Sequence, residues 1–184
     1  MLAKDLMTKP ATICRPWDTA QTAATLMKTH SVGTLPVVSD GQDPLLEGIV
    51  TDRDLCIAVV AAEATSKPVI VADVMSRAPA TGLPETSLEE CLSLMRNARV
   101  GQIPIVDHRA RCVGILTLAD LARCAPPADI VCTLRAISEA PQGADTPPFD
   151  EAYFYCGQLH ESDQIALLER RRQQATHHEQ EVLQ

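Results

Sequence analysis

A threonine followed three residues later by an aspartate occurs twice after an apolar run, at Thr51 and Asp54 and again at Thr117 and Asp120. This spacing is typical of a helix N-cap with an acidic residue one turn in, where both side chains satisfy free backbone N–H groups. The same helix start presents unpaired N–H groups and the positive end of the helix dipole, which favour phosphate. A threonine hydroxyl can donate to a phosphate oxygen, and a carboxylate can accept from two ribose hydroxyls. Two interpretations stay open, a capped helix and a capped helix that also holds a nucleotide.

Arg53 adds a positive charge beside the first of these pairs and could hold a phosphate as a bidentate fork. Its counterpart in the second pair is Ala119, which carries no charge. The sequence therefore predicts two inequivalent sites. The first is expected to prefer a phosphorylated ligand, and the second to be weaker, to take another ligand or to stay empty. The alternative for Arg53 is an ordinary exposed arginine at a helix start.

The two pairs belong to a unit that the chain contains twice. Residues 5–38 align with residues 73–106, and after a two-residue length difference residues 48–55 align with residues 114–121. Each copy, of about 55 residues, is small for an independent hydrophobic core. Two copies packed face to face with approximate two-fold symmetry are therefore expected.

Each copy is predicted to contain strand, helix, strand, strand and helix, after a short lead-in helix around residues 4–7 and 72–75. The helices are expected to start at Asp18 and Thr86, each with a capping-box partner three residues on, and to stop near Gly33 and Gly101. Strands are predicted at 35–38 and 103–106, followed by strands that end at 48–50 and 114–116.

Three motifs, each present in both copies, resemble the CBS domain, which is named for cystathionine β-synthase. They are the lead-in (4–8 and 72–76), the Val-Gly-to-Val segment (32–38 and 100–106) and the Gly-Ile-to-Leu segment (48–55 and 114–121). The resemblance covers about residues 1–123. It implies an α/β (α+β) fold of two pseudo-two-fold-related β-α-β-β-α CBS units packed sheet to sheet. A C-terminal helical tail, which the resemblance does not reach, is expected to follow them. The expected domains are 1–66, 67–124 and 125–184.

What the resemblance implies is a regulatory adenine-nucleotide-binding module, not an enzyme. Such pairs bind AMP, ADP, ATP, S-adenosylmethionine or related ligands in the clefts between the copies, signal to a partner, and often form homodimers. In the family the threonine and aspartate contact phosphate and ribose, and the first strand and the Gly-to-Pro segment form the adenine slot. The expected nucleotide-binding residues are Thr12, Ile13, Gly33, Thr34, Leu35, Pro36, Thr51, Arg53, Asp54, Ala80, Thr81, Gly101, Gln102, Ile103, Pro104, Thr117 and Asp120. The alternative is a ligand-free dimerisation or protein-interaction module.

Composition narrows the classes of partner and chemistry. A net charge of -8 argues against nucleic acid and anionic membranes as partners. The seven cysteines include no C-x-x-C spacing, so neither a disulfide framework nor a structural zinc site is expected. The sequence has no nucleophile–base pair, metal ligand set or P-loop, and we predict no catalysis, required cofactor or metal. Without a signal peptide or a long apolar stretch, we expect a cytoplasmic protein.

The last third of the chain is different in kind. Residues 128–140 are predicted to form a helix that packs on the paired module through Ile130, Val131, Leu134 and Ile137. Residues 141–148 are a linker by composition, and the aromatic cluster 149–155 and a helical stretch at 162–180 follow. Two interpretations are open for the segment 149–184. It docks on its own module or on a dimer mate, or it is a docking peptide for a separate partner protein, anchored by aromatic side chains.

Overall fold

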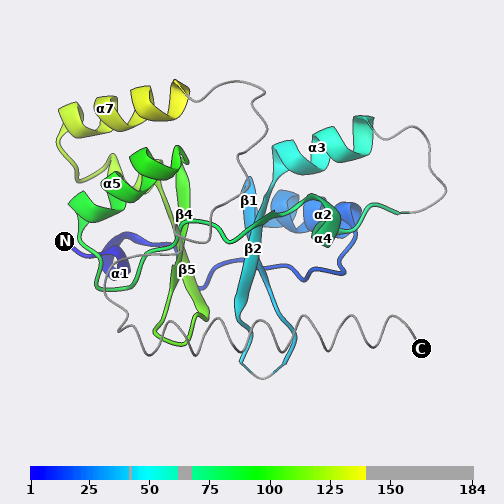
Figure 1. Ribbon diagram of the computed structural model, residues 1–184. Coiled ribbons are helices and arrows are strands. Elements are labelled where there is room, and N and C mark those ends of the chain that lie inside the picture. The colour runs from blue at the N-terminus through cyan, green and yellow to red at the C-terminus, as the bar shows by residue number, and fades with distance from the viewer. Residues whose placement is uncertain (42, 62–67, 140–184) are drawn as a thin grey trace. The chain divides into compact units, whose positions relative to one another are not determined.

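The computed structural model of the 184-residue chain describes residues 1–41, 43–61 and 68–139, which belong to one compact unit (Figure 1). The predicted linker 141–148, the aromatic cluster 149–155 and the predicted helical stretch 162–180 lie outside the described residues. Among the described residues, none of the helices combines the length and the apolar composition that a membrane span requires.

Each repeat is built around an antiparallel hairpin between two helices, as predicted. The elements of the first repeat are α2 (Ala20–His30), β1 (Thr34–Val38), β2 (Leu46–Thr51) and α3 (Asp52–Ala61). Those of the second are α5 (Leu88–Ala98), β4 (Gln102–Val106), β5 (Cys112–Thr117) and α6 (Leu118–Leu121). Thr34 stands opposite Thr51 in the first hairpin and Gln102 opposite Thr117 in the second. In both hairpins the strand register shifts just before the last residue pair. The two repeats therefore share this backbone irregularity as well as their sequence pattern.

The predicted first strand of each repeat is not a strand in the structure. It is reduced to one parallel bridge, from Cys14 to Val37 in the first repeat and from Gly82 to Ile105 in the second. Prolines flank both bridging residues, at positions 10 and 16 and at positions 79 and 84. Because proline has no N–H group to donate to a ladder, pairing cannot extend far from the bridge.

The N-caps of the first helices were predicted one residue too early. Thr19 caps α2 and Ser87 caps α5, each accepting from the backbone N–H three residues on. Asp18 instead accepts from the backbone N–H of Arg15 at 2.7 Å, and Thr86 closes the equivalent turn of the second repeat. In each repeat, two neighbouring residues carry a side-chain oxygen that could cap the helix. The oxygen of the earlier residue accepts a hydrogen bond within the turn before the helix, so the later residue becomes the cap.

The two helices end near Gly33 and Gly101, as expected, but neither glycine is the residue that caps the helix. Ser31 and Arg99 follow α2 and α5 in the left-handed conformation, with φ of 53° and 54°. Their N–H groups bond back into the last helical turn, so these non-glycine residues form the C-caps. Gly33 and Gly101 lie two residues further on, where they join the helix to the strand.

The lead-in segments are exchanged between the repeats. Helix α1 (Ala3–Leu6) precedes the first repeat but binds the second, where Ala3 N donates to Thr86 O at 2.8 Å and Thr8 N to Ile115 O at 2.9 Å. Helix α4 (Val71–Val74) precedes the second repeat but binds the first, and β3 (Ser76–Arg77) adds a strand beside β2.

This exchange is built into the two hydrophobic cores. Val71 and Met75 belong to the core of the first repeat, whereas Ala3 is buried in the core of the second. Each core is completed by apolar side chains from the other lead-in, so the two repeats stabilise each other. The domain limits 1–66, 67–124 and 125–184 stay predictions.

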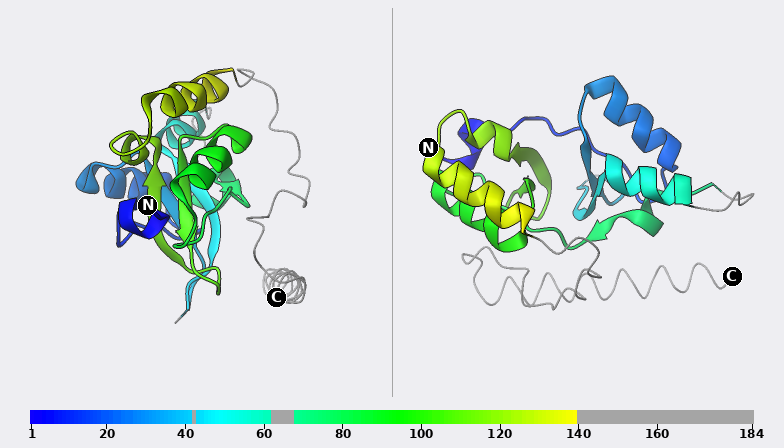
Figure 2. Two further views of the ribbon diagram at one scale, coloured as in Figure 1. Left: turned by 90° about the vertical axis from the view of Figure 1, so that its left-hand side faces the viewer. Right: turned by 90° about the horizontal axis from the view of Figure 1, so that it is seen from above.

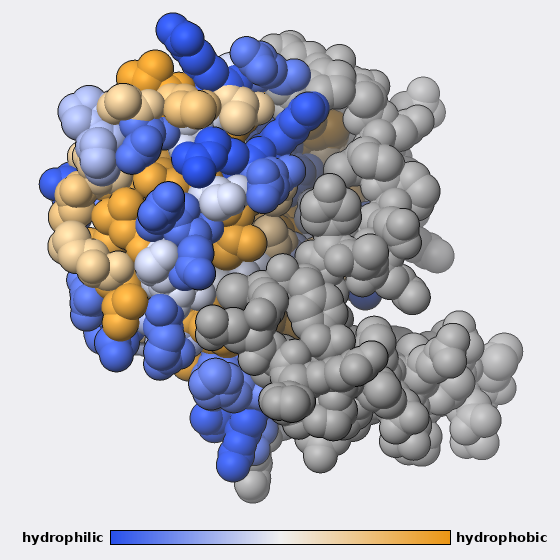
Figure 3. Space-filling view, turned by 60° about the vertical axis from the view of Figure 1, so that its left-hand side comes forward, coloured by the Kyte–Doolittle hydropathy of each residue, from blue (hydrophilic) through white to orange (hydrophobic). Residues whose placement is uncertain are grey.

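The predicted tail helix is confirmed as α7 (Pro127–Ser138), which lies alongside α5 in Figures 1 and 2. Ile130 and Ile137 pack against the second core, as expected. Val131 and Leu134 remain 48% and 49% exposed, so the prediction was wrong for these two side chains. On the side of the molecule that carries α5 and α7, apolar side chains reach the surface among charged ones (Figure 3).

Candidate functional site

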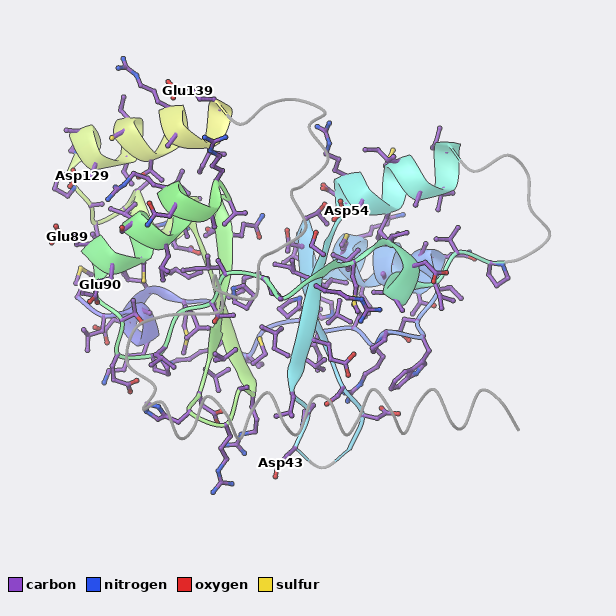
Figure 4. The ribbon with its side chains drawn as sticks, viewed as in Figure 1. Asp43, Asp54, Glu89, Glu90, Asp129 and Glu139 are labelled. Atoms are coloured by element: carbon purple, nitrogen blue, oxygen red, sulfur yellow. The ribbon has the colours of Figure 1, made fainter. Side chains whose placement is uncertain are left out.

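The first Thr–Asp pair lies where β2 passes into α3. Thr51 donates its hydroxyl and its backbone N–H to Oδ2 of Asp54, at 2.7 and 2.9 Å, and Asp54 N donates back to the hydroxyl oxygen at 3.2 Å. Figure 4 labels Asp54 at the start of α3. The capping interpretation is therefore observed. The other oxygen of Asp54, Oδ1, has no hydrogen-bond partner among the described residues and can accept from a ligand.

The second pair repeats this geometry. Thr117 donates its hydroxyl and its backbone N–H to Oδ2 of Asp120, at 2.7 and 3.0 Å, and Asp120 N donates to the hydroxyl oxygen at 3.1 Å. Oδ1 of Asp120 lies 3.9 Å from the guanidinium of Arg123, which is itself 78% exposed. The two carboxylates are thus held alike, but the second has a cation nearby. Helix α6 is also only four residues long, against ten for α3.

Backbone hydrogen bonds connect each Thr–Asp pair to its Gly-to-Pro segment. Asp52 N donates to Gly33 O at 2.9 Å, and Leu118 N donates to Gly101 O at 2.8 Å. The strand register adds Thr34 and Gln102, which pair across the hairpin with the two motif threonines. The structure therefore brings the predicted phosphate–ribose residues and the start of the predicted adenine segment together in both repeats.

The remaining predicted residues divide by the direction of their side chains. Leu35 and Ile103 are fully buried in the two hydrophobic cores, so a ligand can reach only their backbone. Pro36 and Pro104 are buried too, and their carbonyl groups accept from the bridging residues of the reduced first strand. Four further predicted residues, which directly precede the bridging residues Cys14 and Gly82, are half-buried: Thr12, Ile13, Ala80 and Thr81.

Sequence reasoning missed Asp52, the residue after the first motif threonine. Oδ1 of its carboxylate accepts from Arg53 N at 2.8 Å, and Oδ2 lies 3.2 Å from the point where a Cβ atom on Gly33 would stand. The counterpart, Leu118, is 8% exposed and packs in the second core, and the space around Gly101 is open. The repeat alignment already pairs an aspartate with a leucine here, and this difference was the available signal.

Two thiols near the hairpins have strongly raised pKa values. Burial, with a smaller contribution from the Asp18 charge, raises the pKa of Cys14 to about 12. Burial also raises the pKa of Cys112 to about 11, although a hydrogen bond with the backbone of Gly114 opposes the shift. Both thiols are neutral at physiological pH and poor ligands or nucleophiles. Nowhere in residues 1–41, 43–61 and 68–139 do three His, Cys, Asp or Glu side chains meet as a metal site.

Comparison with known sequences places the repeats in one family of domains. The family model of the CBS domain matches residues 3–61 and 71–126. A CBS domain-containing protein of Bacillus subtilis, YhcV, is 40% identical over 119 residues, which cover 65% of this chain and 81% of YhcV. The residues that match the family model include both Thr–Asp pairs, one in each repeat.

Solved structures share the arrangement. The crystal structure of CBSX2 in complex with AMP superposes with a TM-score of 0.56 at 26% identity, covering 66% of this chain and 93% of that one. The CBS domain pair of protein MJ0100, in complex with 5′-methylthioadenosine and S-adenosyl-L-methionine, gives a TM-score of 0.57 at 28% identity, covering 67% and 94%. Both are CBS pairs crystallised with adenosine-containing molecules.

Proposed function

Because the chain belongs to the CBS domain family, we propose that it is a regulatory module that binds an adenosine-containing ligand in two sites. The ligand is a nucleotide of the AMP type or another adenosyl compound. Binding signals to a partner protein or controls the oligomeric state of the chain itself. The ligands named for CBSX2 and MJ0100 support the adenosine class.

The observation that carries this proposal is the repeated geometry of the Thr–Asp pairs. In each repeat one carboxylate oxygen is fixed by the threonine, and the other is left to accept from a ribose hydroxyl. The Gly-to-Pro segment is hydrogen-bonded to the same helix start, so sugar and base contacts are close together.

Thermal unfolding in the presence of candidate ligands tests the proposal. A ligand that binds only the folded state raises its stability by about 2.7 kcal/mol at a concentration of one hundred times Kd. We expect AMP, 5′-methylthioadenosine or S-adenosylmethionine to raise the melting temperature, and the double variant Asp54→Ala/Asp120→Ala to abolish the rise. Glu85→Gln changes an exposed carboxylate outside the site and serves as the control. A flat melting temperature for every adenosine compound at millimolar concentration contradicts the proposal.

A second candidate is a dimerisation or protein-interaction module whose sites stay empty. The exposed apolar side chains of α3 favour it, since Ile57 is 54% and Val60 78% exposed. Surfaces of this kind commonly bind a partner, here a second copy of the chain. Sedimentation equilibrium with and without ligand separates the two candidates. A dimer that is indifferent to every adenosine compound supports the second one. The docking role of segment 149–184 stays a prediction.

A further inference from the structure

The two sites differ in the residues that follow the motif threonine. Asp52 and Arg53 follow Thr51, whereas Leu118 and Ala119 follow Thr117. Arg53 taken alone predicts a preference of the first site for phosphate. The position of Asp52 in the structure changes this expectation, because its carboxylate lies between the helix start and Gly33.

The carboxylate of Asp52 is held in place by the same kind of donor that would hold a phosphate. Its Oδ1 accepts the backbone N–H of Arg53 at 2.8 Å, one of the free donors at the start of α3. Its Oδ2 lies 3.2 Å from the Cβ position of Gly33, the first residue of the predicted adenine segment. A phosphate at this helix start would therefore compete with an internal anion for an N–H group and be repelled by it.

Arg53 does not offset this charge in a fixed way. Its side chain is exposed, and its guanidinium has no hydrogen bond or ion pair within the part of the chain that the structure describes. Both side chains are exposed, but the carboxylate of Asp52 is hydrogen-bonded to the backbone at the start of α3, whereas the guanidinium of Arg53 has no such contact. At the second site Leu118 has no acceptor and packs in the core, so no such anion is present there.

We propose that Asp52 determines the ligand preference of the first site, which takes an adenosine derivative with an uncharged or positively charged 5′ substituent in preference to one with a 5′-phosphate. The ligand class is that of adenosyl thioethers and sulfonium compounds. The inference rests on the proposed function, because it assumes that an adenosine lies between Gly33 and Asp54.

Isothermal titration of the full chain with AMP and with 5′-methylthioadenosine tests this assignment. Asp120→Ala removes the ribose contact of the second site, so that the titration reports the first site. In this background we expect 5′-methylthioadenosine to bind more tightly than AMP. Adding Asp52→Asn keeps the shape and the acceptor oxygen but removes the charge. This change should strengthen AMP binding about five- to tenfold, the effect of removing one like charge at short range, and leave 5′-methylthioadenosine within about twofold.

Glu85→Gln in the same background removes one negative charge outside the site and should change neither affinity. Circular dichroism and a thermal melt of each variant show that it is folded. An AMP affinity that Asp52→Asn leaves unchanged, or a parent protein that prefers AMP, overturns the assignment while the proposed function stands. If neither compound binds the wild-type chain, the assignment fails, and the proposed function fails with it when no other adenosine compound raises the melting temperature either.

Discussion

Met75 lies against Gly48, with its sulfur 2.9 Å from the point where a Cβ atom on that glycine would stand. The carbonyl oxygen of Ser76 is 2.8 Å from the same point. The second repeat has the same relationship, in which Met7 of the other lead-in closes on Gly114. The exchange of lead-ins therefore depends on two positions that have no side chain.

Gly48→Ala should lower the free energy of unfolding by about 1–3 kcal/mol, because the added methyl group meets a backbone oxygen that cannot move without breaking the β2–β3 pairing. Urea denaturation at neutral pH measures the loss. Gly101→Ala is the matched control, since nothing stands within 4 Å of its Cβ position. Equal losses from the two substitutions would contradict the close approach of the lead-in.

The hydroxyl of Thr133 should contribute to the docking of α7 on α5. Thr133 is fully buried, donates to Asp129 O at 2.8 Å and accepts from the guanidinium of Arg96 at 3.1 Å. Thr133→Val keeps the volume but leaves Arg96 without this acceptor, and we expect a loss of about 1 kcal/mol in unfolding free energy. Ser138→Ala removes a similar bond from an exposed hydroxyl and should change little. The docking contact is refuted if the two variants unfold at the same urea concentration.

The cysteines should divide into two classes by their reactivity. Thiolates react with alkylating reagents, and at about pH 8 a thiol with a pKa near 12, like that of Cys14, is almost fully protonated. Cys14 and Cys91 are also buried, whereas Cys56, Cys124 and Cys132 are exposed. We expect iodoacetamide to label the exposed three first, as read by peptide mass spectrometry. In urea the difference should disappear. Labelling of Cys14 at the rate of Cys56 in the folded protein would contradict the assigned burial.

The turns of the two hairpins are joined by Arg111, which contacts Asp107 at 2.6 Å and Asp43 at 3.1 Å. Figure 4 places Asp43 at the end of the first hairpin that is remote from Asp54. Partial burial raises the pKa of Asp107, but hydrogen bonds from Arg111 and from two backbone N–H groups outweigh it and hold the pKa below its ordinary 3.8. The contribution of Asp107 to stability is therefore complete above pH 3.8 and is lost as the pH falls through its folded pKa.

Arg111→Gln should consequently lower the urea midpoint at neutral pH, by a small amount because the pair is partly exposed. The difference in urea midpoint between the wild type and the variant should become smaller below pH 3.8, where Asp107 becomes protonated. Arg109→Gln, at an exposed turn position, is the control and should not change the midpoint. A gap that is constant from neutral to acid pH would show that the ion pair does not stabilise the fold.

Local spacing in the sequence was sufficient for the repeat, the two hairpins and the helix caps of the motif. Thr51 and Asp54 are three residues apart, and a helix start brings that spacing within hydrogen-bond distance whatever surrounds it. The same logic misplaced the caps of α2 and α5 by one residue, because adjacent oxygens at Asp18 and Thr19 both satisfy it. Where two neighbouring side chains compete for local donors, spacing alone cannot choose between them.

The sequence by itself determined that two copies of a small unit are present and that each copy places a threonine and an aspartate at a helix start. These features follow from short-range hydrogen bonding and from the periodic spacing of apolar residues. Only the tertiary structure decided that the lead-ins cross to the opposite core and that Asp52 lies over Gly33. Those contacts join residues far apart in the chain. The core that each lead-in joins is chosen by which arrangement buries most apolar surface, and that quantity cannot be obtained from the spacing of residues along the sequence. Asp52 is brought to Gly33 by the hairpin register that sets Thr51 opposite Thr34.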